Sequence, residues 1–110
     1  MRHLRSYLAS HGFKILTESY SEDSGKCYAV FLATYTGECR VLDECEAELP
    51  APDCEIIGVG AFIAYLNMKI GAYRRAAAGK MAGGEREPRE LCIISKMEER
   101  IESLRSVLNA

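Results

Sequence analysis

The sequence lacks any uncharged run long enough to cross a lipid bilayer. A membrane-spanning helix needs about 20 consecutive apolar residues, whereas the uncharged stretch at residues 56–68 is followed at once by Lys69. No secretory leader is recognisable in residues 1–10, and the five cysteines are odd in number and irregularly spaced. Such cysteines are typical of the reducing cytosol, where they behave as small buried hydrophobic residues. These absences predict a soluble, cytoplasmic protein.

The sequence also lacks a catalytic or metal-binding signature. Cys39, Cys45 and Cys54 form no CxxC pair, and the two histidines do not cluster, so a structural zinc site is not expected. A cysteine nucleophile paired with His3 or His11 stays open, but nothing marks one thiol as activated. We therefore expect a non-enzymatic protein with no catalytic residue, no metal site and no cofactor.

The chain has little net charge, but its charges are segregated. A formal net charge of -2 provides no overall attraction to nucleic acid or to an anionic membrane. Acids gather in residues 38–55 and bases in residues 69–89. The acids could engage a protein partner or a divalent cation, although such a run is more often a solvated strand end. Candidate partner-binding acids are Asp43, Glu44, Glu46 and Glu48, and candidate phosphate- or partner-contacting bases are Lys69, Arg74, Arg75, Lys80, Arg86 and Arg89.

Residues 53–79 predict one long helix that is apolar on almost every side. Asp53 is placed to cap its start, and Gly79 is placed to close it. A helix that is apolar all round must be covered on more than one face. An alternative interpretation makes residues 56–59 a short fourth strand, with the helix beginning near Ala61.

Three glycines, Gly58, Gly60 and Gly71, lie within this predicted helix. Each costs about 1 kcal/mol relative to alanine, and close approach of another backbone is the simplest explanation. The small-residue stripe, defined as Gly60, Ala64, Asn67 and Gly71, is therefore a candidate packing face. It packs either within one chain or against a second copy, and the second interpretation favours a homodimer.

The first half of the chain predicts a helix followed by a sheet. Residues 2–11 suit a short helix closed by Gly12. Residues 13–20, 27–36 and 39–45 suit three strands of an antiparallel meander, with residues 27–36 in the middle and a turn at Gly25.

The last part of the chain predicts an amphipathic helix at residues 88–109, after a linker at 46–52 and a glycine-rich loop at 80–87. Its apolar residues recur at spacings of three and four, which predicts one buried face: Leu91, Ile94, Met97, Ile101, Leu104 and Leu108. The whole chain is thus expected to be one α+β domain of order α-β-β-β-α-α. Its three-stranded antiparallel meander would pack against the long apolar central helix and the amphipathic C-terminal helix.

The first five predicted elements share the α-β-β-β-α order of double-stranded-RNA-binding domains. Those domains open the last helix with a lysine-rich motif, whereas Asp53-Cys54-Glu55 would repel phosphate here, so RNA binding is disfavoured. The favoured hypothesis is a small protein–protein interaction module. It would act as an inhibitor or adaptor of a larger assembly, as phage-encoded anti-defence proteins of the anti-CRISPR type do. The alternative is a nucleic-acid-binding or regulatory protein that uses the basic region at residues 69–89.

Overall fold

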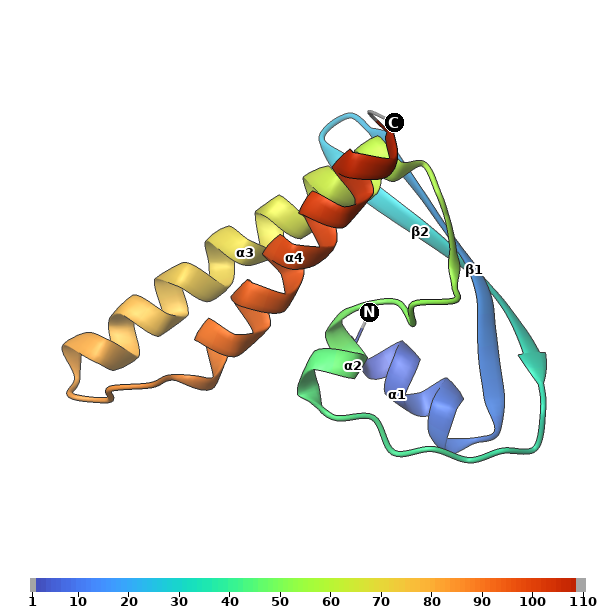
Figure 1. Cartoon of the computed structure of the whole chain (residues 1–110), viewed down its shortest axis with the longest axis horizontal. Helices are drawn as coiled ribbons and strands as arrows, with labels where there is room; N and C mark the ends of the chain where they lie inside the picture. Colours follow the sequence, from blue (N-terminus) through green and yellow to red (C-terminus); the bar gives the residue numbers. More distant parts are fainter. Residues whose placement is uncertain (1, 109–110) are drawn as a thin grey trace. The chain divides into compact units, whose positions relative to one another are not determined.

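The computed structural model describes residues 2–108 as two compact units, which divide after Phe62. We call them the N-terminal unit and the helical unit. The elements in chain order are α1 (Arg2–Ser10), β1 (Phe13–Asp23), β2 (Lys26–Tyr35), α2 (Glu44–Glu48), β3 (Glu55–Ile57), α3 (Val59–Ala82) and α4 (Arg89–Leu108) (Figure 1). The fold is α+β, as predicted. Whether the two units act as a single domain stays a prediction.

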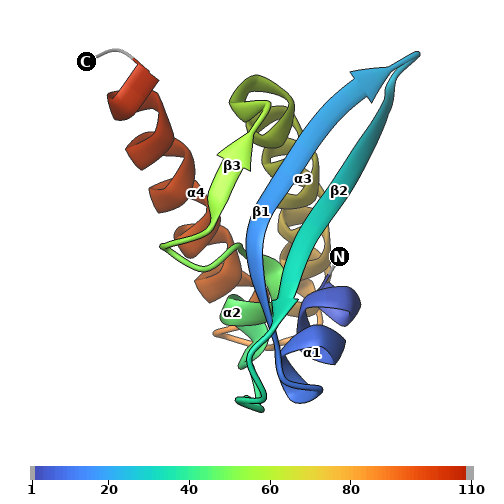
Figure 2. The ribbon, with the colours of Figure 1, turned by 90° about the vertical axis from the view of Figure 1, so that its right-hand side faces the viewer.

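The three strands form a mixed sheet in the order β2-β1-β3 (Figure 2). β1 and β2 are antiparallel neighbours, whereas β3 runs parallel to β1. Ser24 and Gly25 connect the first two strands, and both have positive φ angles, as a tight two-residue hairpin turn requires. The predicted turn at Gly25 is confirmed. The purely antiparallel meander is wrong, and so is the middle position of residues 27–36, because β1 is the central strand.

The predicted third strand at residues 39–45 is also wrong, because α2 begins within it. Asp43 is the N-cap of α2 and accepts a hydrogen bond from the backbone nitrogen of Glu46 at 2.8 Å. The Glu46 carboxylate accepts one in return from the backbone nitrogen of Asp43 at 3.2 Å. This reciprocal capping box stabilises a helix start, so the local Asp-x-x-Glu pattern prevails over a weak strand pattern. With α2 present, the element order no longer matches that of double-stranded-RNA-binding domains.

The long helix begins at Val59 rather than at Asp53, and it continues past Gly79 to Ala82. Residues Glu55–Ile57 instead form β3, close to the alternative that placed a short strand at residues 56–59. Asp53 lies before that strand and pairs with Lys14 at 2.7 Å. Gly58 separates β3 from α3 with a φ of 74°, a conformation that side chains with a Cβ adopt only at a cost. The N-cap predicted at Asp53 and the end predicted at Gly79 are therefore wrong.

A buried ionic network holds the N-terminal unit together. Arg5 of α1 and Glu18 of β1 are 3% and 0% exposed, and Arg5 donates from Nε and Nη2 to the two Glu18 carboxylate oxygens at 3.0 and 2.7 Å. Arg5 Nη1 also donates to the backbone oxygen of Ala47 in α2 at 3.0 Å. The Tyr20 hydroxyl completes the network by donating to Glu18 Oε1 at 2.6 Å. One arginine thereby connects α1, β1 and α2.

The helical unit is an antiparallel pair formed by α3, from Ile63 onward, and α4 (Figure 1). Ile94, Met97 and Ile101 of the predicted α4 face are buried, and Ile93 is buried beside them. The burial predicted at the two ends of that face is wrong, because Leu91 and Leu108 are exposed. Periodicity indicates the direction of an apolar face, whereas tertiary packing decides how much of its length is covered.

We predict that Arg5→Met lowers the free energy of unfolding by about 3–5 kcal/mol, because it leaves the Glu18 carboxylate buried without its cation. Arg40→Met is the control, because it removes a partner of the solvent-exposed Arg40–Glu46 pair and should cost less than about 1 kcal/mol. Urea unfolding measures both. The double variant Arg5→Met/Glu18→Met should recover most of the loss. Equal losses for Arg5→Met and Arg40→Met would contradict the importance of the network.

Candidate protein-interaction surfaces

The small-residue stripe lies on α3 and is largely open. Gly60, Ala64 and Asn67 are exposed, and Gly71 is half-buried. A Cβ atom added at Gly60 would meet nothing within 4 Å, and one added at Gly71 would meet only the guanidinium tip of Arg75 at 3.6 Å. The close backbone approach expected within the chain is therefore absent at both glycines among the residues that the structure describes.

The exposed face of α3 carries unusually little charge along its first half. No charged residue occurs between Glu55 and Lys69, and Met68 is 60% exposed near the stripe. The exposed face of α4 is instead rich in charged side chains, including Glu99 and Lys96. Because uncharged exposed surface of this kind marks interaction sites more often than ordinary solvated surface, α3 is the better candidate for contact with another protein.

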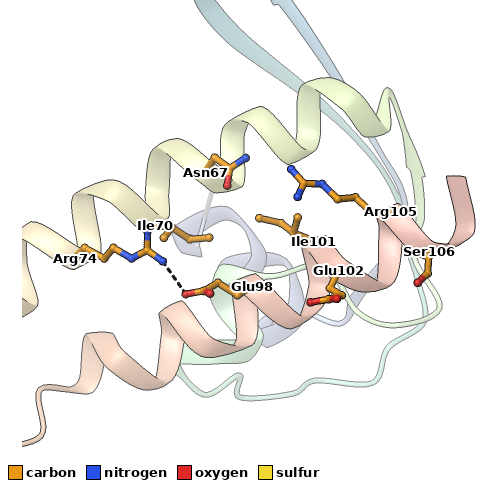
Figure 3. Close-up of a pocket in the computed structure, with 8 residues that line it drawn as sticks. All are labelled: Asn67, Ile70, Arg74, Glu98, Ile101, Glu102, Arg105 and Ser106. Atoms are coloured by element: carbon orange, nitrogen blue, oxygen red, sulfur yellow. Dashed lines mark hydrogen bonds and ion pairs between the residues drawn. The ribbon is translucent and has the colours of Figure 1, made fainter. Parts of the chain in front are cut away.

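A groove of about 550 Å³ lies between α3 and α4, within the helical unit (Figure 3). We call it the interhelical groove. Ile70 and Ile101 contribute its apolar surface, and Arg74 crosses it to donate to Glu98 at 3.0 Å. The residues that line it are Asn67, Ile70, Arg74, Glu98, Ile101, Glu102, Arg105 and Ser106.

The interhelical groove brings together residues from two predicted sites and adds several that sequence reasoning missed. Asn67 belongs to the small-residue stripe and Arg74 to the predicted basic set. Glu98, Glu102 and Arg105 were missed, although their spacings of four and three place them on one side of α4. Two arginines and two glutamates balance in charge, so the groove does not concentrate positive charge for a phosphate.

The predicted acidic set is mainly engaged within the N-terminal unit. Asp43 caps α2, and Glu46 both completes the capping box and pairs with Arg40 at 2.9 Å. Glu48 is buried, with its carboxylate 3.7 Å from Arg2. Glu44 is exposed in the first turn of α2. Asp43, Glu44 and Glu46 lie at the start of α2, which they stabilise, whereas Glu48 is its last residue.

Several of the predicted bases are engaged within the helical unit. Lys80 binds the buried Glu90 carboxylate at 2.6 Å, and Arg89 lies 3.7 Å from the same carboxylate. The hydrogen bond from Lys80 lowers the pKa of Glu90 below its ordinary value. Arg74 pairs with Glu98. Because these three bases already have acidic neighbours, they offer less positive charge to an external phosphate.

The remaining bases are less engaged. The ammonium group of Lys69 lies 5.6 Å from the centre of the Tyr73 ring. Arg75 and Arg86 are exposed, and neither makes an ion pair with another residue in the part of the chain that the structure describes. The structure therefore places the six bases along α3, the following loop and the start of α4 without drawing them into one cluster.

The thiols and histidines of residues 2–108 form neither a disulfide nor a metal-binding group. All five cysteines are free there, and no group of three metal-binding side chains occurs among those residues. Burial, together with the negative charge of Glu18, raises the pKa of Cys54 to about 11. That thiol is therefore protonated near neutral pH and is a poor nucleophile. The His11 Nδ1 atom lies 2.8 Å from the backbone oxygen of Tyr7, on the same helical segment.

Within residues 2–108, none of the helices combines the length and the hydropathy that a membrane crossing requires. No protein-family model, curated protein or solved structure matches the chain.

We predict opposite effects for the same substitution at two neighbouring glycines. Gly60→Ala should raise the free energy of unfolding by about 0.5–1 kcal/mol, because the helix gains a better helix former and the new methyl group meets open space. Gly58→Ala should lower it by about 2–4 kcal/mol, because the positive φ is strained and the Cβ would overlap the backbone oxygen of Tyr20.

Denaturant unfolding at a protein concentration that keeps the chain monomeric measures both variants against the wild type. Destabilisation by Gly60→Ala under these conditions would contradict an open α3 face, since it would reveal a close contact within the chain.

Proposed function

We propose that this chain is a small non-enzymatic protein–protein interaction module that acts as an inhibitor or adaptor of a larger macromolecular assembly. The observation that carries this proposal is the charge-free first half of α3, on which Gly60, Ala64, Asn67 and Met68 are exposed and a Cβ at Gly60 would meet nothing. The protonated Cys54 thiol and the fully engaged Arg5–Glu18 network support a binding role over catalysis. The five free cysteines fit a reducing compartment such as the cytoplasm.

The α3 face has the properties of a helix-docking surface. Gly60 and Ala64 allow the backbone of a partner helix to come close, and Met68 supplies a flexible apolar side chain that adapts to different partner shapes. The interhelical groove adjoins this face at Asn67 and contributes ion-paired side chains at its rim. An apolar centre with a polar rim is the usual anatomy of a protein interface.

The partners that we propose are a protein of a larger assembly and a second copy of this chain. The stripe on α3 suits either occupant, because small residues favour close helix packing in both cases. Nucleic acid is less favoured, since Arg74, Lys80 and Arg89 have acidic neighbours within the helical unit.

The role of α3 is tested with immobilised wild-type protein and two leucine variants in a lysate of its source cells. Ala64→Leu should lose the specific partner, because an overpacked contact costs about 1–3 kcal/mol, a roughly 5- to 150-fold loss of affinity. Ser103→Leu, at an exposed position of α4, is the matched control and should retain it. The partner is identified by mass spectrometry, and its affinity for each purified variant is measured by calorimetry. Equal affinities for Ala64→Leu and wild type would contradict docking on α3.

The nucleic-acid alternative is tested through its salt dependence. We expect no measurable binding of a short duplex or single strand even at low salt. If Arg75 and Arg86 do neutralise phosphates, binding appears at low salt and falls steeply as salt rises. In that case the double variant Arg75→Glu/Arg86→Glu would abolish it, whereas the control Lys96→Glu on α4 would not, and the alternative would replace the interaction-module proposal.

A further inference from the structure

The outer edge of β2 is a row of backbone groups that no described residue pairs. β2 is ten residues long, and its only neighbour in the sheet is β1 (Figure 2). Strand edges of this kind offer unpaired N–H and C=O groups to another extended chain. An antiparallel or parallel strand added at this edge would continue the sheet.

The side chains of β2 make this edge more suitable for pairing. The strand alternates between exposed and half-buried residues, and Tyr28, Val30 and Leu32 are 50%, 70% and 60% exposed on its outer face. Lys26, at the first position, is its only charged residue, and the strand contains neither proline nor glycine. Proteins usually protect an edge with prolines, charges, bulges or very short strands. The central part of β2 contains no proline, glycine or charge. The irregularity in its pairing lies on β1, between Ile15 and Thr17.

We propose that a second copy of this chain binds at this edge, with the two β2 strands antiparallel about a twofold axis at Phe31. Two three-stranded sheets would then join into one of six strands. This inference rests on the proposed interaction function and assigns the homodimer interface to β2. The exposed face of α3 then stays available for the partner protein of the larger assembly. A symmetric dimer needs a surface that is complementary to itself, and an antiparallel strand pair satisfies that requirement.

When the twofold axis passes through Phe31, exposed apolar residues of one β2 strand lie opposite exposed apolar residues of the other. Residues directly opposite each other lie on the same face of a sheet, so the exposed Val30 of each copy meets Leu32 of the other. This apolar contact occurs twice, and such cross-strand pairs contribute roughly 0.2–1 kcal/mol each.

The charges at the ends of the strand are compatible with the same arrangement. Lys26 is the first residue of β2 and lies far from the axis at Phe31, where it faces no charged residue of the strand in the other copy. No two like charges face each other along β2. A second copy therefore offers an extended strand and a matching apolar row together.

The test begins with light scattering on the wild-type protein from micromolar to millimolar concentration. We expect the mass to rise to twice the 12.2 kDa of one chain. Val30→Lys should return the mass to that of one chain, because it places a charge in the centre of the pairing row. Val41→Lys is the matched control, since Val41 is 94% exposed outside β2, and it should leave the dimer intact. Circular dichroism confirms that both variants are folded.

A cross-link tests the register without depending on a disruptive variant. In the proposed arrangement, Tyr35→Cys places a thiol opposite the native Cys27 of the second copy, at a Cα separation of about 4.5–5.5 Å that suits a disulfide. Mild oxidation should give a covalent dimer whose linked peptides contain positions 27 and 35. Thr34→Cys is the control, because it lies opposite Tyr28 and should give no such link.

Three results would overturn the β2 assignment. They are a monomeric wild type at millimolar concentration, growth beyond a dimer, and a dimer that Ala64→Leu dissociates while Val30→Lys does not. The last result would move the second copy to α3 and leave the proposed function standing. Partner binding by the monomeric Val30→Lys variant separates the two proposals: retained binding supports the interaction module on its own, and lost binding would contradict a docking face on α3 that works independently of the dimer.

Discussion

The buried ion pair between Arg5 and Glu18 is the interaction on which the N-terminal unit depends. Two charges removed from water are tolerated only when each finds close opposite charge and further hydrogen bonds. Glu18 lies on the central strand β1, so Arg5 must bring α1 against that strand. The remaining guanidinium donor then binds Ala47, which draws α2 to the same place. Such a network favours this arrangement of the three elements, because burying either charge without its partner is costly.

The two proposed interaction surfaces are parts of α3 and β2 that no other element of residues 2–108 covers. Along α4, exposed positions are charged and well solvated, whereas the first half of α3 exposes small uncharged residues. On β2 the exposed groups include the backbone itself. In the two proposals, a partner helix uses side-chain packing on the first surface and a second copy uses main-chain hydrogen bonding on the second.

Much of the local structure could be predicted because its cause lies in a few adjacent residues. Gly12 and Gly25 adopt the positive φ angles expected where a helix closes and a hairpin turns, since those conformations are easiest for glycine. The small-residue stripe was also predicted from helical spacing alone. The structure shows Gly60, Ala64 and Asn67 exposed, and the role of the stripe as a packing face stays a prediction. The capping box at Asp43 was readable in the sequence as well, but the strand-like composition around it obscured the short helix.

The sequence by itself determined the α+β class, the helical character of most of α3 and α4, and the turn at Gly25, because periodicity and backbone freedom are local properties. Only the tertiary structure decided that β1 lies at the centre of the sheet and that β3 runs parallel to it. It also decided that Gly58 must be glycine, since the atom that a Cβ would overlap belongs to Tyr20. The same holds for the edge position of β2. Each of these features depends on residues far apart in the chain, whose pairing no local pattern encodes.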